Sequence, residues 1–154
     1  MTTAQMIEHA SAGLMSITPE QAEGFWLARA GRLVDVRESD ELVEHGWIAG
    51  SVHVPRGLLE FRADPTCASY QPELDPAVPT VIYDTAGHRA VLAARTLADL
   101  GYEQVAFLAG GFAGWVRAGL PVMGPAGAPG LSPDPGPGLD DVLVSQFINK
   151  RSAR

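Results

Sequence analysis

The fold is decided by the stretch TVIYDTAGHR at residues 80–89, where a short apolar run passes directly into a polar loop that contains glycine. The first four residues are mostly apolar, as in a strand that is covered on both faces. The residues that follow, AVLAARTLADL at 90–100, are good helix formers and end at Gly101. The stretch therefore predicts a strand over 80–83, then a loop, then a helix over 87–100.

The same alternation continues on both sides of this stretch. Short apolar runs predict three more strands, at residues 33–36, 51–54 and 105–108. Helices are expected at residues 18–30, 38–44 and 110–118. Thr18 and Gln21 form a capping box at the start of the first helix, and Leu42 and Val43 are expected to face inward from the second. Strands separated by helices predict an α/β three-layer sandwich, with a largely parallel central sheet and helices on both faces.

The composition predicts four segments along the chain. A packed domain is expected over residues 16–123, preceded by an N-terminal extension at 1–15. Within the domain, residues 64–79 contain four prolines and are expected to form a surface excursion rather than packed structure. Ten of the fifteen residues from 124 to 138 are Gly or Pro, which predicts a linker. Residues 139–154 are expected to form a C-terminal tail that begins with an amphipathic helix.

Charge and cysteine content exclude several classes of function. The net charge of -7 argues against a nucleic-acid surface or an anionic membrane as partner. No apolar run approaches the roughly 18 residues that a membrane span needs. The first residues do not read as a secretory signal. The single cysteine, Cys67, cannot form an internal disulfide. A cytoplasmic location is therefore expected.

Four short motifs follow one another along the chain: LVDVRE at 33–38, HGWIAGSVHVP at 45–55, GGFAGW at 110–115 and GLPV at 119–122. In this order, they resemble the motifs of the rhodanese family. Ala49 stands where the family usually has proline. The resemblance covers roughly residues 16–123 and implies the family's three-layer fold.

The resemblance also implies a functional loop. In the family this loop begins with a nucleophilic cysteine directly after a strand and commonly carries arginine five residues later. Gly87 and Arg89 fit that pattern, but Asp84 stands at the position of the cysteine. The implied anion-binding loop consists of Asp84, Thr85, Ala86, Gly87, His88 and Arg89. Asp35 and Arg37 are expected to support it through hydrogen bonds.

A carboxylate changes what such a loop can do. Inward-pointing amides at the start of a helix favour an anion, and in a working rhodanese they stabilise a thiolate or persulfide. Asp84 forms no persulfide, and its charge repels a substrate anion about 4 Å away by several kcal/mol at a surface-type dielectric. Sulfur transfer through position 84 is therefore not expected. The chain is expected to act as a binding or regulatory module, with a small anion or a protein partner at the loop.

Other interpretations of the loop remain open at this stage. Asp84 can cap the helix, accept a cationic group from a partner, or act as an aspartyl nucleophile in a hydrolase. The last option usually needs a second aspartate at the position of Ala86. Cys67 is a candidate replacement thiol. The chain can also be a thiosulfate sulfurtransferase whose cysteine at position 84 has been altered.

Neither a metal nor a cofactor is expected. His9, His45, His53 and His88 show no paired metal spacing. The glycine-rich motif at 110–114 lacks the Lys-Ser/Thr ending of a phosphate-binding loop. The amphipathic segment at 139–150 is expected to dock on its own domain, on a second copy of the chain or on another protein.

Overall fold

The computed structural model describes residues 1–124. The expected C-terminal helix and all of the expected linker beyond Gly124 lie outside the described residues. The strands are β1 (Met15–Ile17), β2 (Arg32–Asp35), β3 (Val52–His53), β4 (Thr80–Tyr83) and β5 (Val105–Leu108). The helices are α1 (Thr3–Ser11), α2 (Pro19–Leu27), α3 (Ser39–His45), the short 3-10 helix η1 (Arg56–Leu58), α4 (Leu59–Ala63), α5 (His88–Asp99) and α6 (Gly111–Arg117).

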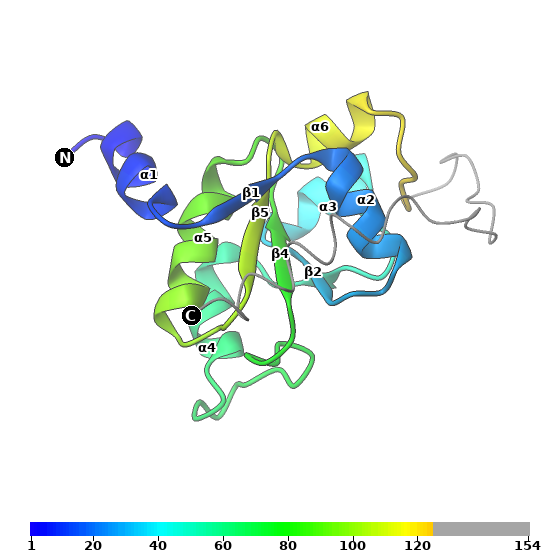
Figure 1. Cartoon of the computed structure of the whole chain (residues 1–154). Coiled ribbons are helices and arrows are strands. Elements are labelled where there is room, and N and C mark those ends of the chain that lie inside the picture. Colours follow the sequence, from blue (N-terminus) through cyan, green and yellow to red (C-terminus); the bar gives the residue numbers. More distant parts are fainter. Residues whose placement is uncertain (125–154) are drawn as a thin grey trace.

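The strands form one parallel sheet, which confirms the predicted fold class. Their order is β1-β5-β4-β2-β3, and every pairing between neighbours is parallel. At the centre, Val34 of β2 lies beside Ile82 of β4, which in turn lies beside Phe107 of β5. Because parallel strands share one direction, their carboxyl ends meet at one edge, at the top in Figure 1.

Helices cover both faces of the sheet, and each face has its own core. Neighbouring residues of a strand point to opposite faces, so Val34 and Ile82 contribute to the core under α5, whereas Leu33 and Val81 contribute to the core under α2 and α6. The first core also contains Leu59 and Ala63 of α4, and the second contains Trp115 of α6. The three-layer sandwich predicted from the sequence is therefore confirmed (Figure 1).

The N-terminal part of the chain contains structure that the sequence did not predict. Residues Met15–Ile17 form the edge strand β1, which pairs with β5. Before it, α1 packs against α5, where Arg95 Nε donates to the carbonyl oxygen of Ala10 at 3.1 Å and Arg95 Nη2 donates to that of Ala12. The segment before residue 16 is thus attached to the α5 face of the domain.

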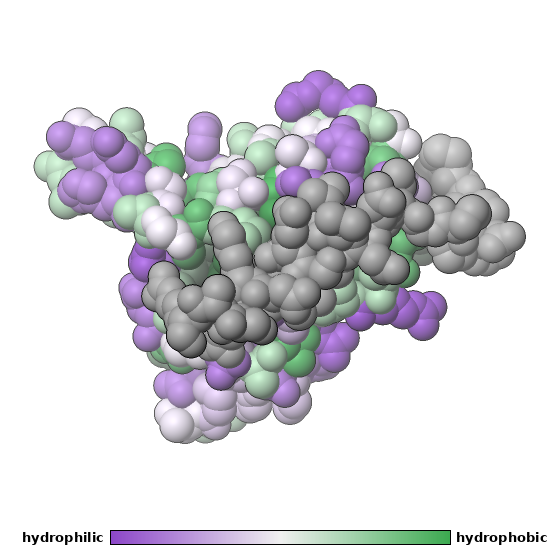
Figure 2. Space-filling view, in the orientation of Figure 1, coloured by the Kyte–Doolittle hydropathy of each residue, from purple (hydrophilic) through white to green (hydrophobic). Residues whose placement is uncertain are grey.

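The proline-rich excursion is packed in part, contrary to expectation. Leu74 is buried, and the hydroxyl of Tyr102 donates to the carbonyl oxygens of Leu74 at 2.7 Å and Ala63 at 3.0 Å. The segment at 64–79 leads to the amino end of β4 and lies at the bottom of Figure 1 and, as part of the molecular surface, at the bottom of Figure 2. It therefore closes the edge of the domain that lies opposite the carboxyl ends of the strands.

The helix α3 lies on the domain with no fully buried residue. The expectation that Val43 faces inward is wrong, because its side chain is 69% exposed. Leu42 is half-buried. A helix of seven residues with so little apolar burial is held by polar contacts, and these lead directly to the loop after β4.

Candidate functional site

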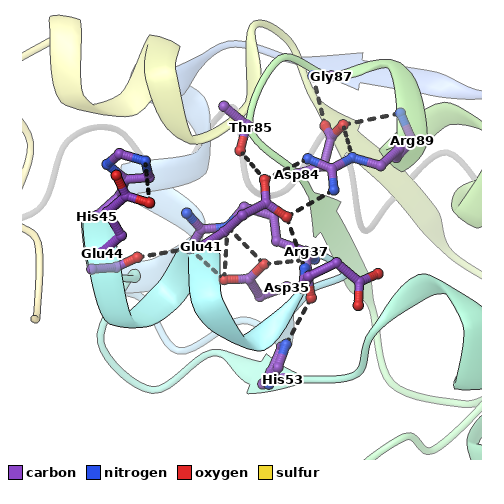
Figure 3. Close-up of polar contacts among 12 residues, drawn as sticks. Asp35, Arg37, Glu41, Glu44, His45, His53, Asp84, Thr85, Gly87 and Arg89 are labelled. Carbon is purple, nitrogen blue, oxygen red and sulfur yellow. Dashed lines mark hydrogen bonds and ion pairs between the residues drawn. The ribbon is translucent and has the colours of Figure 1, made fainter.

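Asp84 lies directly after β4, and its carboxylate is turned into its own loop. The side chain is 2% exposed. Its Oδ1 accepts a hydrogen bond from the amide of Gly87 at 2.6 Å, and its Oδ2 accepts one from the amide of Arg89 at 3.0 Å (Figure 3). Both donors lie at the start of α5, where the helix dipole favours a negative charge. Gly87 is the N-cap residue of α5, so Asp84 lies three residues before the cap and satisfies two amides at the helix start from the loop.

Arg89 is held by a residue that the sequence analysis missed. Its Nη1 and Nη2 donate to Oε2 and Oε1 of Glu41 at 2.9 and 2.8 Å, and its Nε lies 3.4 Å from Asp84 Oδ2. Glu41 belongs to α3 and also accepts a hydrogen bond from the hydroxyl of Thr85 at 3.0 Å and one from the amide of Glu38 at 2.8 Å. Glu41 therefore ties α3 to the loop (Figure 3).

This pairing fixes the charge of both partners. The hydrogen bonds from Arg89 lower the pKa of Glu41 to about 2, which outweighs the opposing effect of burial. The same hydrogen bonds raise the pKa of Arg89. Both side chains therefore stay charged across the neutral and mildly acidic range, so the guanidinium remains between two carboxylates.

Asp35 and Arg37 form a buried ion pair at the end of β2. Both side chains are 0% exposed, and Arg37 Nη2 lies 2.7 Å from Asp35 Oδ2. Arg37 also donates to the carbonyl oxygen of Gly46 at 2.8 Å, and its guanidinium carbon lies 4.2 Å from the ring centre of Phe112. The amide of Phe112 donates to the carbonyl oxygen of Asp84 at 2.7 Å. The pair thus reaches the loop through the first turn of α6.

The glycine-rich motif at the start of α6 allows the close approach of two backbones. Gly111 has a φ of +59°, and a Cβ at this position would lie 2.4 Å from the carbonyl oxygen of Asp84. The amide of Ala113 donates to the carbonyl oxygen of Thr85 at 3.0 Å. Only glycine fits this contact, so the motif supports the base of the 84–89 loop.

The structure therefore brings most of the expected site residues together. Asp84, Thr85, Gly87 and Arg89 form one polar network with Glu41, and Asp35 and Arg37 lie at the neighbouring strand end (Figure 3). Ala86 and His88 are exposed. These two residues form the outer surface of the loop.

Residues 20–118 match the family model described as a rhodanese-like domain. The chain belongs to the rhodanese-like domain family. It is 33% identical over 95 residues to a curated protein of Allochromatium vinosum named sulfurtransferase, a match that covers 62% of this chain and 80% of that one.

Solved structures with the same rhodanese-like fold carry varied descriptions. One is a protein of unknown function from Rhodopseudomonas palustris that is described as a possible tyrosine phosphatase. It is 32% identical to this chain with a TM-score of 0.77, and the match covers 80% of this chain and 95% of that one. A polysulfide-sulfur transferase homodimer from Wolinella succinogenes is 28% identical with a TM-score of 0.64, covering 83% and 91%. The family membership and the fold expected from the motifs are confirmed.

Cys67 lies too far from the 84–89 loop to supply a thiol there. It lies in the segment that leads to the amino end of β4, whereas Asp84 follows the carboxyl end of the same strand. A strand of four residues separates the two ends by roughly 10 Å or more. Figure 1 shows the two connections at opposite edges of the sheet.

The aspartyl-nucleophile interpretation does not fit the geometry either. A nucleophile needs an oxygen that faces solvent or substrate. Both carboxylate oxygens of Asp84 accept hydrogen bonds from the loop, and the side chain is almost completely buried. For the same reason Asp84 is not open to a cationic group of a partner.

Two further findings concern residues 1–124 as a whole. In this range no three His, Cys, Asp or Glu side chains lie close enough together to hold a metal ion. None of the helices there is both long and apolar enough to cross a bilayer.

Proposed function

We propose that this rhodanese-like domain has no thiosulfate:cyanide sulfurtransferase activity and acts as a binding or regulatory module through the 84–89 loop. The observation that carries the proposal is the position of the Asp84 carboxylate, which accepts the amides of Gly87 and Arg89. In a rhodanese the thiolate or persulfide needs these donors. In this chain the same donors bind the carboxylate of Asp84, which cannot carry sulfur.

The chemistry of sulfur transfer explains why this substitution is decisive. A thiolate attacks the outer sulfur of thiosulfate, sulfite leaves, and the persulfide that forms gives its sulfur to cyanide. The carboxylate of Asp84 cannot store sulfur in this way, and its negative charge repels thiosulfate. Cys67 lies at the opposite edge of the sheet and cannot take its place.

The outer surface of the loop supports a binding role. Ala86 and His88 are exposed there, and Thr85 and Arg89 are half-buried beside them. A rigid loop with exposed tips, fixed from below by backbone hydrogen bonds, suits recognition of a protein surface. A partner would contact these outer residues and not Asp84. A cytoplasmic location remains part of the proposal, because the single cysteine requires no oxidising compartment.

The second candidate function is sulfur transfer by a chain whose position 84 has been altered. The name of the Allochromatium vinosum relative favours it. The two candidates differ in one result, namely whether a cysteine restored at position 84 supports turnover.

The direct test is thiocyanate formation from thiosulfate and cyanide. We expect the wild-type chain to form thiocyanate no faster than a Cys67→Ser variant, which contains no thiol at all. For comparison, the Asp84→Cys variant of the Cys67→Ser chain has a single thiol, which lies at position 84. Thiocyanate formation by this variant would favour the second candidate function. Turnover of the wild-type chain at about 1 s⁻¹ or faster, within the ordinary range of enzymes, would overturn the proposal.

A further inference from the structure

The contacts of Arg89 assign a second residue to the control of this loop. We propose that Glu41 is a specificity-determining residue, which excludes anions from the mouth of the loop independently of Asp84. It does so by holding the arginine that would otherwise face an anion. This inference extends the proposed function to the charge of the ligand and rests on the same loop.

All three guanidinium nitrogens of Arg89 face carboxylates. Nη1 and Nη2 donate to Glu41 at 2.9 and 2.8 Å, and Nε lies 3.4 Å from Asp84. Glu41 takes the edge formed by Nη1 and Nη2, and Asp84 lies against Nε on the other edge, so neither edge of the guanidinium is free to bind an anion in bidentate fashion. The arginine of the loop is therefore occupied before any ligand arrives (Figure 3).

The local charge leads to the same conclusion. Arg89 is the only Lys or Arg between residues 84 and 89. Together with the carboxylates of Asp84 and Glu41 it gives the mouth of the loop a net charge of minus one, and the buried pair of Asp35 and Arg37 adds none. Neutralising Asp84 alone would bring this net charge only to zero. An anion would then still meet an arginine whose Nη1 and Nη2 are paired with Glu41, with only the Nε edge released.

Glu41 is fixed in this role by contacts other than Arg89. Its Oε1 accepts the hydroxyl of Thr85 at 3.0 Å, and its Oε2 accepts the amide of Glu38 at 2.8 Å. The carboxylate is half-buried and is anchored on α3 and on the loop together. A side chain held at several points does not swing away when an anion approaches, so the exclusion belongs to the resting structure.

The test uses a cysteine at position 84 as a local probe of charge. In a chain that carries Cys67→Ser and Asp84→Cys, the sulfur is alkylated with iodoacetate, an anion, and with neutral iodoacetamide. The two reagents are nearly equal in size, so burial of the sulfur slows both and cancels from the ratio of their rates. This ratio reports the potential at the mouth of the loop and needs no catalytic turnover.

Glu41→Gln is then compared with Glu44→Gln in the same chain. Both changes remove one negative charge from α3, but Glu44 is 74% exposed and pairs with His45 at 3.7 Å. We expect Glu41→Gln to raise the iodoacetate-to-iodoacetamide ratio about fivefold, and Glu44→Gln to change it less than about twofold.

Equal changes in the two variants, or an unchanged ratio in Glu41→Gln, would overturn the inference. If the Gln variant does not fold, Glu41→Asp replaces it. Asp keeps the charge but is one methylene shorter and loses the bidentate contact, so a ratio above that of Glu44→Gln is again expected, and a ratio equal to it would count against the role. Thiocyanate formation by the wild-type chain would defeat the proposed function but leave these ratios interpretable.

Discussion

Asp84→Cys, made in a Cys67→Ser chain, is expected to yield a thiol whose pKa lies about two units below the value of roughly 8.5 for free cysteine. The amides of Gly87 and Arg89, which now donate to Asp84 at 2.6 and 3.0 Å, would donate to the thiolate. The twelve-residue helix α5 begins beside them, and its dipole also favours the negative charge. Glu41 opposes this effect, which limits the size of the shift.

The pKa is measured from the ultraviolet absorbance of the thiolate as a function of pH, so it does not depend on reagent access to a buried sulfur. A short peptide with the loop sequence and the same cysteine is the control. At pH 7 the shift raises the thiolate fraction from a few per cent to more than half. A pKa equal to that of the peptide would show that the amides of the loop do not converge on position 84.

Arg37→Met is expected to destabilise the domain by about 3–5 kcal/mol. Methionine keeps much of the apolar volume of Arg37 beside Phe112 but leaves the completely buried carboxylate of Asp35 without its ionic partner. The amide of residue 37, at 3.1 Å, would still donate to it. Since a domain is stable by about 5–15 kcal/mol, this is a large share of the total.

The free energy of unfolding in urea measures this loss, and Arg56→Met is the matched control. Arg56 also pairs with a carboxylate, Glu60, at 2.9 Å, but these side chains are 30% and 45% exposed. Its removal should cost about 1 kcal/mol or less. Similar losses of unfolding free energy in the two variants would show that breaking the buried pair of Asp35 and Arg37 costs no more than breaking an exposed ion pair.

The order of elements could be predicted because it depends on local patterns. The apolar run at 80–83 coincides with β4, and the expected helix at 87–100 differs from α5 by one residue at each end. The capping box of Thr18 and Gln21 is present with both hydrogen bonds. In each case the residues that decide the structure are neighbours in the chain.

The parts that could not be predicted depend on distant residues. Glu41 and Arg89 are 48 positions apart, so no local pattern indicates that they pair. Glu41 lies three residues after Glu38, the N-cap of α3, and this local spacing gives no sign that Glu41 also binds the loop. The helical pattern predicted that Val43 faces inward. Its side chain is exposed instead, because α3 lies at the surface of the domain. The edge strand β1 has only three residues, too few for a clear alternation.

The carboxylate of Asp84 accepts the hydrogen bonds of the Gly87 and Arg89 amides that a sulfur anion in the loop would need. The most direct measurement follows the backbone amide resonances of Gly87 and Arg89 by NMR while thiosulfate is added to the wild-type chain. We expect no saturable shift at concentrations up to about 10 mM, the range of very weak binding. Saturable shifts of these two amides in that range would show that thiosulfate reaches the loop, and would contradict the account.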